Sequence, residues 1–226
     1  MKKSVLSLGE LALLSLLSLI VVFSSTVGAL LKKYGEQRII FSSAEPAPRT
    51  VILDAGHGGE DSGAVGVNGI LEKDVNLTVT LEIGRILTEK GYRVIYTRRS
   101  DKLLYTEEQN IKGIRKINDL KNRCKIAEEN EGAIFVSIHQ NSFSEEKYSG
   151  LQVYYSTAND TSRLLAESIQ KRVREEVQPE NHRKVKKGEG IYLMEHIEGE
   201  AVLIECGFLS NQRECDLLSQ KEYQNR

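Results

Sequence analysis

The sequence has little cysteine and no excess of charge of either sign, and both features exclude classes of protein. Its three cysteines, Cys124, Cys206 and Cys215, form no CxxC motif. The sequence therefore predicts neither a disulfide framework nor a zinc site built from thiolates, and Cys206 is interpreted as a small buried hydrophobic residue. The 31 basic and 32 acidic residues give a formal net charge of −1. Nucleic acid is not expected as a partner, because no surplus positive charge is available for phosphates.

Internal repeats and low-complexity tracts are also lacking, and the 226 residues suffice for one sizeable α/β domain. The first 31 residues differ from the rest: Lys2 and Lys3 precede an almost wholly apolar run over 11–23, and small residues follow up to Ala29. This pattern is typical either of an export signal cleaved after Ala29 or of a retained membrane anchor. A buried core helix fits less well, because no polar residues mark a second face. We expect the remainder to function outside the cytoplasm.

Residues 32–49 are a predicted linker, and the globular domain is expected to span 50–226. Within this domain, apolar runs predict strands at 51–55, 93–97, 133–138, 150–155 and 201–205. Helices are predicted at about 73–90, in a segment ending at about 129, and at about 160–177 and 211–219. Strands that alternate with helices predict a mostly parallel sheet with helices on both faces.

Three chemically versatile side chains lie at or just past the ends of predicted strands: His57, His139 and Glu205. A fourth, Glu72, opens the helix that follows the first strand. Ligands of parallel sheets bind beyond the carboxyl ends of the strands. If these strands are parallel neighbours, the side chains converge at one edge of the sheet.

Two imidazoles and a carboxylate are a typical ligand set for catalytic zinc, with water at the fourth position. The sequence offers His57, Glu72 and His139 as ligands and Glu205 as a general base. Singly, each histidine could be structural, and Glu72 could be a helix N-terminal charge. Glu205 is harder to explain in this way, because burying an unpaired carboxylate costs several kcal/mol. His182 and His196 lie in polar, loop-like surroundings and are expected to be exposed to solvent. They are therefore not candidate ligands.

Four segments resemble the zinc-dependent N-acetylmuramoyl-L-alanine amidases of bacterial cell walls, a family with a DxGHGG motif. They are Asp54–Gly59, Leu71–Leu77, Ser137–Asn141 and Val202–Asn211, and the pair Thr97–Arg98 matches as well. The resemblance covers about 50–219. Gln140 departs from it, since family members commonly have alanine there, and we expect this side chain to narrow or polarise the pocket.

The resemblance implies that His57, Glu72 and His139 bind Zn²⁺ and that Glu205 is the catalytic glutamate. It implies hydrolysis of the amide between N-acetylmuramic acid and L-alanine of peptidoglycan. The implied fold is a single three-layer α/β domain, a mixed sheet of about six strands between helices. The family's domain usually has a further helix after a segment like 221–224, and we expect that helix to be missing from this sequence.

An export segment followed by a catalytic domain resembles the germination-specific amidases of endospore formers, which act on spore cortex so that muramic-δ-lactam can form. Three alternatives remain. One is a vegetative amidase in wall turnover or cell separation, another is an inactive peptidoglycan-binding module, and the third is a zinc carboxypeptidase. The last would need an arginine placed for a terminal carboxylate, and the sequence does not place one. An activating or localising protein partner is also expected, because no separate wall-binding domain is evident.

Overall fold

The computed structural model describes residues 9, 23–29 and 49–226. Residues 23–29 are helical. No helix in these described ranges is long and apolar enough to cross a membrane. Most of the predicted export segment (1–31) and linker (32–49) lies outside the described residues, so both assignments stay predictions. The fold below is that of the unit Pro48–Arg226.

A six-stranded sheet forms the centre of this unit, in the order β2-β1-β3-β6-β4-β5. The strands are β1 (Thr50–Ala55), β2 (Arg93–Tyr96), β3 (Ile134–Asn141), β4 (Gln152–Tyr155), β5 (Lys186–Lys187) and β6 (Ala201–Phe208). β2, β1, β3 and β6 pair in parallel, whereas β4 pairs antiparallel with β6 and parallel with β5. The predicted mixed, mostly parallel sheet is confirmed.

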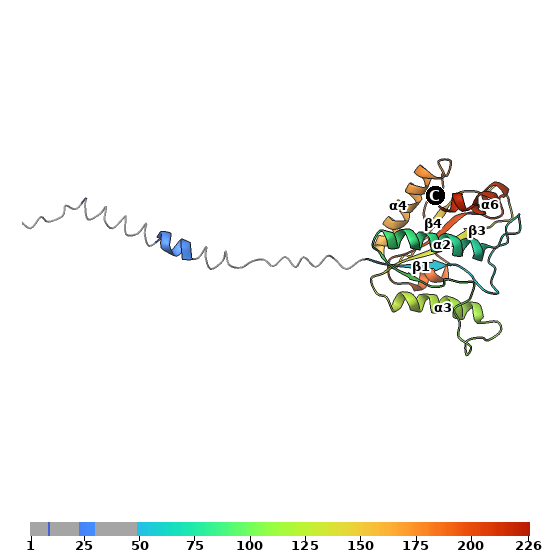
Figure 1. Ribbon diagram of the computed structural model, residues 1–226, viewed down its shortest axis with the longest axis horizontal. Helices are drawn as coiled ribbons and strands as arrows, with labels where there is room; N and C mark the ends of the chain where they lie inside the picture. Colours follow the sequence, from blue (N-terminus) through green and yellow to red (C-terminus); the bar gives the residue numbers. More distant parts are fainter. Residues whose placement is uncertain (1–8, 10–22, 30–48) are drawn as a thin grey trace, which may run out of the picture. The chain divides into compact units, whose positions relative to one another are not determined.

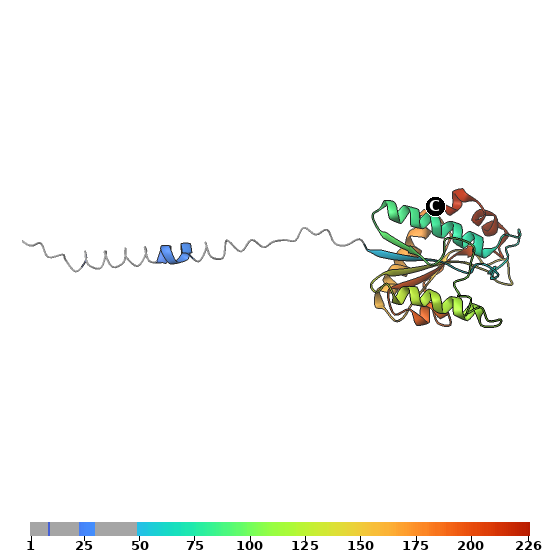
Figure 2. The same ribbon diagram turned by 60° about the horizontal axis from the view of Figure 1, so that its bottom comes forward.

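Helices cover both faces of the sheet, and Figures 1 and 2 show the three layers with α2 and α3 on opposite sides. The helices are α2 (Glu72–Glu89), α3 (Arg115–Glu128), α4 (Asp160–Glu176), α5 (Tyr192–His196), α6 (Gln212–Leu218) and α7 (Lys221–Gln224). Buried side chains of α2, α4 and α6 share one hydrophobic cluster with Ile138 of β3. Those of α3 and α5 share a second cluster with Phe135 of the same strand. Alternate residues of β3 thus face opposite layers, as strand geometry requires.

The structure adds elements that the sequence analysis did not assign. β5 and α5 lie in stretches left as loop or undefined, and β6 continues past the predicted end at Glu205 to Phe208. β5 has only two residues and depends on pairing with β4, so its own sequence carries no strand signal. Cys124, Cys206 and Cys215 are free thiols. Cys206, interpreted from the sequence as a small buried hydrophobic residue, is partly buried and packs against the hydrophobic cluster that includes Ile138.

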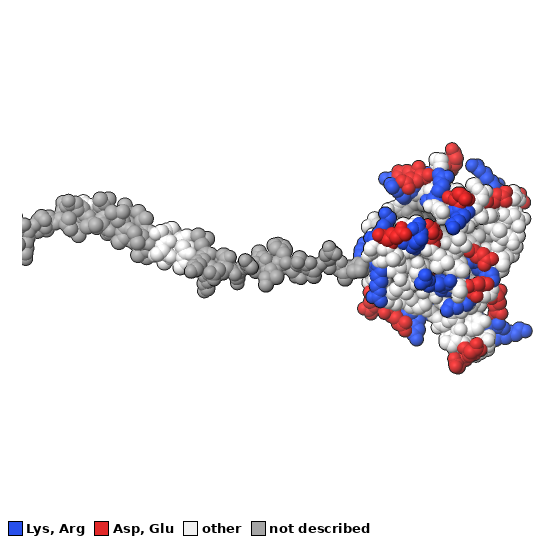
Figure 3. Space-filling view, in the orientation of Figure 1, with Lys and Arg blue, Asp and Glu red and all other residues white. Residues whose placement is uncertain are grey.

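The described surface is charged with both signs interspersed on the face that Figure 3 displays. Many of these charges pair along single helices, as Arg85 does with Glu82 and Glu89 on α2. Exposed pairs of this kind contribute little to stability. The charges that matter for the fold are instead those that the sheet and helices bury.

A buried ionic cluster lies behind the carboxyl end of β1. Arg123 of α3 forms ion pairs with Asp54 of β1 and with Asp119, and the exposed fraction of the Arg123 side chain is 1%. Asp54 also accepts hydrogen bonds from the hydroxyls of Thr97 (2.7 Å) and Ser137 (2.6 Å). Burial raises the pKa of Asp54, but Arg123 and the two hydroxyls outweigh burial and hold that pKa below its usual range.

Two buried arginines bind the backbone that follows β1. Arg123 donates to the carbonyls of Ala55 (2.8 Å) and His57 (2.9 Å). Arg98 donates to Ala55 (2.8 Å) and to Gly56 (2.9 Å). Three consecutive carbonyl oxygens at the end of β1 are thereby bound by guanidinium groups. The turn that carries His57 is held by charge-assisted hydrogen bonds from the protein interior.

Asp54→Ala should lower the free energy of unfolding by about 3–5 kcal/mol, because it leaves the positive charge of Arg123 buried without its partner. Urea unfolding with chelator present measures this. Glu167→Ala, which removes one partner of an exposed pair with Arg163, is the control and should have a far smaller effect. Because the pKa of Asp54 is lowered by folding, its contribution is present above the unfolded value of about 4 and is lost at lower pH. The difference between wild type and variant should therefore narrow in acid, and a pH-independent difference would contradict the assignment.

Candidate metal centre

The predicted convergence of side chains at one edge of the sheet is confirmed. β1, β3 and β6 are parallel neighbours, and the Cα atoms of His139 and Glu205 are register partners on β3 and β6. His57 lies two residues past the end of β1, and Glu72 is the first residue of α2. Segments far apart in the sequence thus meet at the carboxyl edge of the sheet, where such folds bind ligands.

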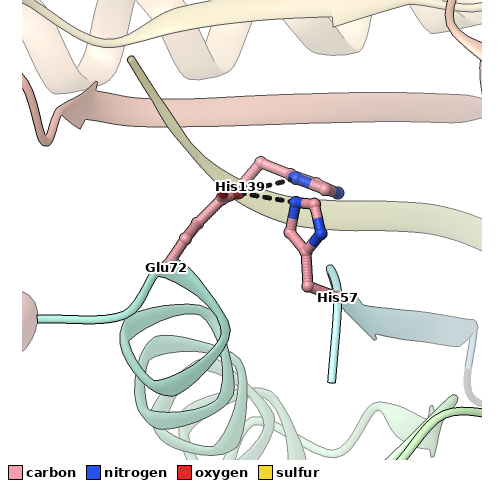
Figure 4. A group of neighbouring side chains, drawn as sticks. All are labelled: His57, Glu72 and His139. Atoms are coloured by element: carbon pink, nitrogen blue, oxygen red, sulfur yellow. Dashed lines mark hydrogen bonds and ion pairs between the residues drawn. The ribbon is translucent and has the colours of Figure 1, made fainter. Parts of the chain in front are cut away.

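His57, Glu72 and His139 form a cluster in which one potential ligand atom of each lies within 4.8 Å of the others. Figure 4 shows both imidazoles turned toward the carboxylate of Glu72. Glu72 Oε1 is 3.1 Å from Nε2 of His57 and 2.9 Å from Nδ1 of His139. Two nitrogens and one carboxylate oxygen that share a centre are suited to hold a metal ion such as zinc.

The electrostatics of the cluster also favour a cation. Burial lowers the pKa of His57, but hydrogen bonds and charge from Asp61 and Glu72 outweigh it and raise that pKa to about 9. Burial raises the pKa of Glu72, yet His139 and His57 bring it well below its usual range. The carboxylates therefore stabilise positive charge here, whether protons or a metal ion supply it. A metal ion bound here would replace these protons, and two imidazole nitrogens with a carboxylate oxygen are a donor set that fits one.

Asp61 is a site residue that the sequence analysis missed. Its Oδ2 lies 2.9 Å from Nδ1 of His57, on the side of the ring away from Glu72. A carboxylate in this position fixes the orientation and tautomer of a metal-binding imidazole. The available signal was a carboxylate four residues after His57, within the same glycine-rich loop. His57 itself has φ of 62°, which non-glycine residues rarely adopt, and Arg123 binds its carbonyl.

The Glu72 carboxylate is held by a separate set of donors. Its Oε2 accepts from the backbone N–H of Ala64 (2.8 Å), and its Oε1 accepts from the backbone N–H of Gln140 (3.1 Å) and from Asn76 Nδ2 (3.2 Å). Asn76 is fully buried and also donates to Gly56 O, while its Oδ1 accepts from Gln140 Nε2 at 3.2 Å. The Gln140 side chain therefore contacts the candidate ligand Glu72 indirectly, through Asn76.

Glycines let backbone approach the cluster closely. A Cβ at Gly56 would lie 2.2 Å from Nε2 of His139, and one at Gly63 would lie 2.5 Å from Oε2 of Glu72. Gly63 also has φ of 64°, a conformation that side chains disfavour. Gly56 and Gly63 are therefore positions at which a side chain would collide with the cluster.

Glu205 differs in environment from the three ligand residues. Its Oε2 is buried and has no hydrogen-bond partner in the described structure. Burial raises the pKa of Glu205; His139 lowers it, Glu72 raises it, and the result is about 7. A carboxyl group of this kind can both take and give a proton near neutral pH. His182 and His196 are exposed, as predicted, and are not members of the cluster.

Comparisons with known proteins agree with the site. A family model described as N-acetylmuramoyl-L-alanine amidase matches residues 51–226. The germination-specific N-acetylmuramoyl-L-alanine amidase of Bacillus subtilis is 39% identical over 178 residues, which cover 79% of this chain and 74% of that protein.

Solved structures show the same similarity. The CwlD amidase of Clostridioides difficile, in complex with the GerS lipoprotein, superposes with a TM-score of 0.75 and 42% identity, covering 78% of this chain and 91% of that one. The amidase AmiC2 of Nostoc punctiforme gives a TM-score of 0.67 and 31% identity, covering 78% and 89%. The fold and the sequence similarity therefore extend over the same domain.

We expect the wild-type protein to bind one zinc ion, and His57→Ala and His139→Ala each to lose most of it, because two ligands hold the ion far less well than three. Elemental analysis of purified proteins after dialysis against trace zinc measures this. His196→Ala removes an exposed histidine and is the matched control. Zinc content equal to wild type in both site variants would contradict the ligand assignment.

Proposed function

Because the chain belongs to the N-acetylmuramoyl-L-alanine amidase family, we propose that His57, Glu72 and His139 bind its catalytic zinc ion and that Glu205 transfers protons. The reaction is hydrolysis of the amide between N-acetylmuramic acid and L-alanine in peptidoglycan. The observation that carries the assignment is the Cα register of His139 with Glu205, which places a carboxyl with an unpartnered buried oxygen beside the ligand cluster.

Zinc is the metal that this donor set suits best, because it accepts imidazole nitrogen and carboxylate oxygen together. When bound, it supplies Lewis-acid chemistry, polarising the amide carbonyl and lowering the pKa of water. The protein's part is to present the donors in fixed orientations. Asp61 holds Nδ1 of His57, so that Nε2 faces the cluster, and Ala64 and Asn76 hold Glu72.

Glu205 provides the proton transfers that amide hydrolysis requires. As a carboxylate it accepts a proton from the attacking water, and as an acid it gives that proton to the departing amine of L-alanine. A pKa near 7, caused mainly by burial, makes both steps accessible at neutral pH. No protein donor in the described structure uses the acceptor Oε2 of Glu205.

Glu205→Gln should retain zinc but lose hydrolysis by roughly 10²–10⁴-fold, the usual cost of losing general acid–base catalysis. Mass spectrometry of muropeptides after digestion of peptidoglycan measures the rate and identifies the bond, through free N-acetylmuramic acid ends and intact peptides that begin with L-alanine. Glu195→Gln changes an exposed carboxylate and is the control. Half of wild-type activity in Glu205→Gln would require another proton donor.

The biological role that we propose is in the spore cortex, at an extracytoplasmic location reached through the N-terminal segment. Its support is the similarity to a germination-specific amidase and to CwlD. A vegetative role in wall turnover or cell separation is the alternative. The CwlD structure contains the GerS lipoprotein, which supports a protein partner for this chain as well.

Cells that lack the protein should form spores whose cortex contains no muramic-δ-lactam. Lactam closure needs the lactyl carboxyl, which stays in amide linkage until an amidase frees it. Muropeptide analysis of spores from a deletion strain, with a strain complemented by the wild-type gene as control, measures the lactam. Normal lactam content together with chaining of growing cells would assign the protein to vegetative wall turnover instead.

A further inference from the structure

The edge of the sheet that carries Glu205 continues onto β4 and the segment that enters β5. Because β4 is antiparallel to β6, the beginning of β4 lies beside the end of β6, and the Cα atoms of Gln152 and Glu205 are register partners. β5 is parallel to β4, so the residues just before β5 reach the same edge. Arg183 is one of these residues.

Arg183 is held in one orientation by three contacts. Its Nε donates to Ser149 O (2.6 Å), its Nη1 donates to Gln152 Oε1 (3.1 Å), and its guanidinium carbon lies 4.5 Å from the centroid of the Phe208 ring. Gln152 is buried and is itself fixed by a bond from its Nε2 to Lys184 O. The guanidinium group of Arg183 is therefore held in a fixed orientation beside Gln152, the register partner of Glu205.

The charge of Arg183 is not paired. Within residues 49–226 it makes no ion pair, and no hydrogen bond engages its Nη2. Glu214 is the carboxylate whose pKa responds to Arg183, but its two oxygens accept from the backbone N–H groups of Gly150 and Phe208, each at 2.8 Å. A half-buried guanidinium with a free edge is suited to a planar anion.

Tyr154 connects this cation to the candidate catalytic residue. Its hydroxyl lies 3.5 Å from Gln152 Oε1, the atom that Arg183 also binds. Burial raises the pKa of Tyr154, the charge of Glu205 raises it further, and the charge of Arg183 lowers it. Both charges therefore act on the same short stretch of the sheet edge.

We propose that Arg183 determines substrate specificity by binding the α-carboxylate of the residue that follows L-alanine, on the peptide side of the scissile amide. The inference rests on the proposed function, in which Glu205 delivers a proton to the amine of L-alanine. Consecutive Cα atoms are about 3.8 Å apart, so a carboxylate on the residue after L-alanine is within one residue of that amine. Gln152 lies on the strand next to Glu205, and Arg183 lies one strand position further on, so the backbones of Glu205 and Arg183 are about 10 Å apart at strand spacings of about 4.8 Å. One peptide residue with a hydrogen bond of about 3 Å at each end spans that distance.

The experiment compares two soluble substrates that differ in one group: N-acetylmuramoyl-L-alanyl-D-glutamate, with a free α-carboxylate, and N-acetylmuramoyl-L-alanyl-D-isoglutamine, with a carboxamide there. Wild type should hydrolyse the carboxylate substrate with a kcat/KM roughly ten- to a hundredfold higher, as expected for one hydrogen-bonded charge pair. Arg183→Gln should abolish this preference, and Arg183→Lys should keep part of it.

Arg172→Gln is the matched control, because Arg172 is an arginine of α4 whose ion pair, with Glu176, lies at the exposed surface. It should leave the ratio between the two substrates unchanged, and melting temperatures report any loss of folding. An Arg183→Gln protein that keeps the wild-type ratio, or a wild type that hydrolyses both substrates equally, overturns the inference. A wild type that hydrolyses neither substrate, nor peptidoglycan, overturns the proposed function instead.

Discussion

The site depends on the hydrogen bonds that two buried arginines make to the backbone after β1. Arg98 and Arg123 bind three consecutive carbonyls, and the last of them belongs to His57, whose φ is positive. Buried guanidinium groups are costly unless they are paired and fully hydrogen-bonded. Asp54 and these carbonyls meet that condition for Arg123. The hydrogen bonds that compensate the buried charge of Arg123 therefore also fix the turn that carries His57, the first candidate ligand.

The candidate metal centre adds two further constraints to this turn. Parallel pairing of β1, β3 and β6 sets the distance between His57 and His139, and the start of α2 inserts Glu72 between the two rings. Two of the three candidate ligands have a supporting side chain, Asp61 for His57 and Asn76 for Glu72. A ligand set fixed in this way loses little conformational freedom when a metal binds, which favours tight binding.

Because β4 runs antiparallel to β6, the two halves of this sheet edge carry different kinds of side chain. On the parallel side the edge carries imidazoles and carboxylates, whereas beyond Glu205 it carries Gln152 and Arg183. Glu205 lies between the two, and its buried Oε2 has no hydrogen-bond partner in the described structure. A substrate with a neutral amide at the centre and a carboxylate on its peptide side matches this distribution of charge.

The sequence by itself determined the strands and helices with strong periodicity and a mostly parallel sheet, and it singled out His57, Glu72, His139 and Glu205, although β3 and β6 continue past His139 and Glu205. Hydrophobic period and strand-end position are local properties, so they can be deduced without coordinates. Only the tertiary structure decided the strand order, the direction of β4 and the existence of β5, because these depend on pairing between distant segments. The same reason explains Asp61 and Arg183, since a charged side chain in a loop carries no local signal of the partner that it meets after folding.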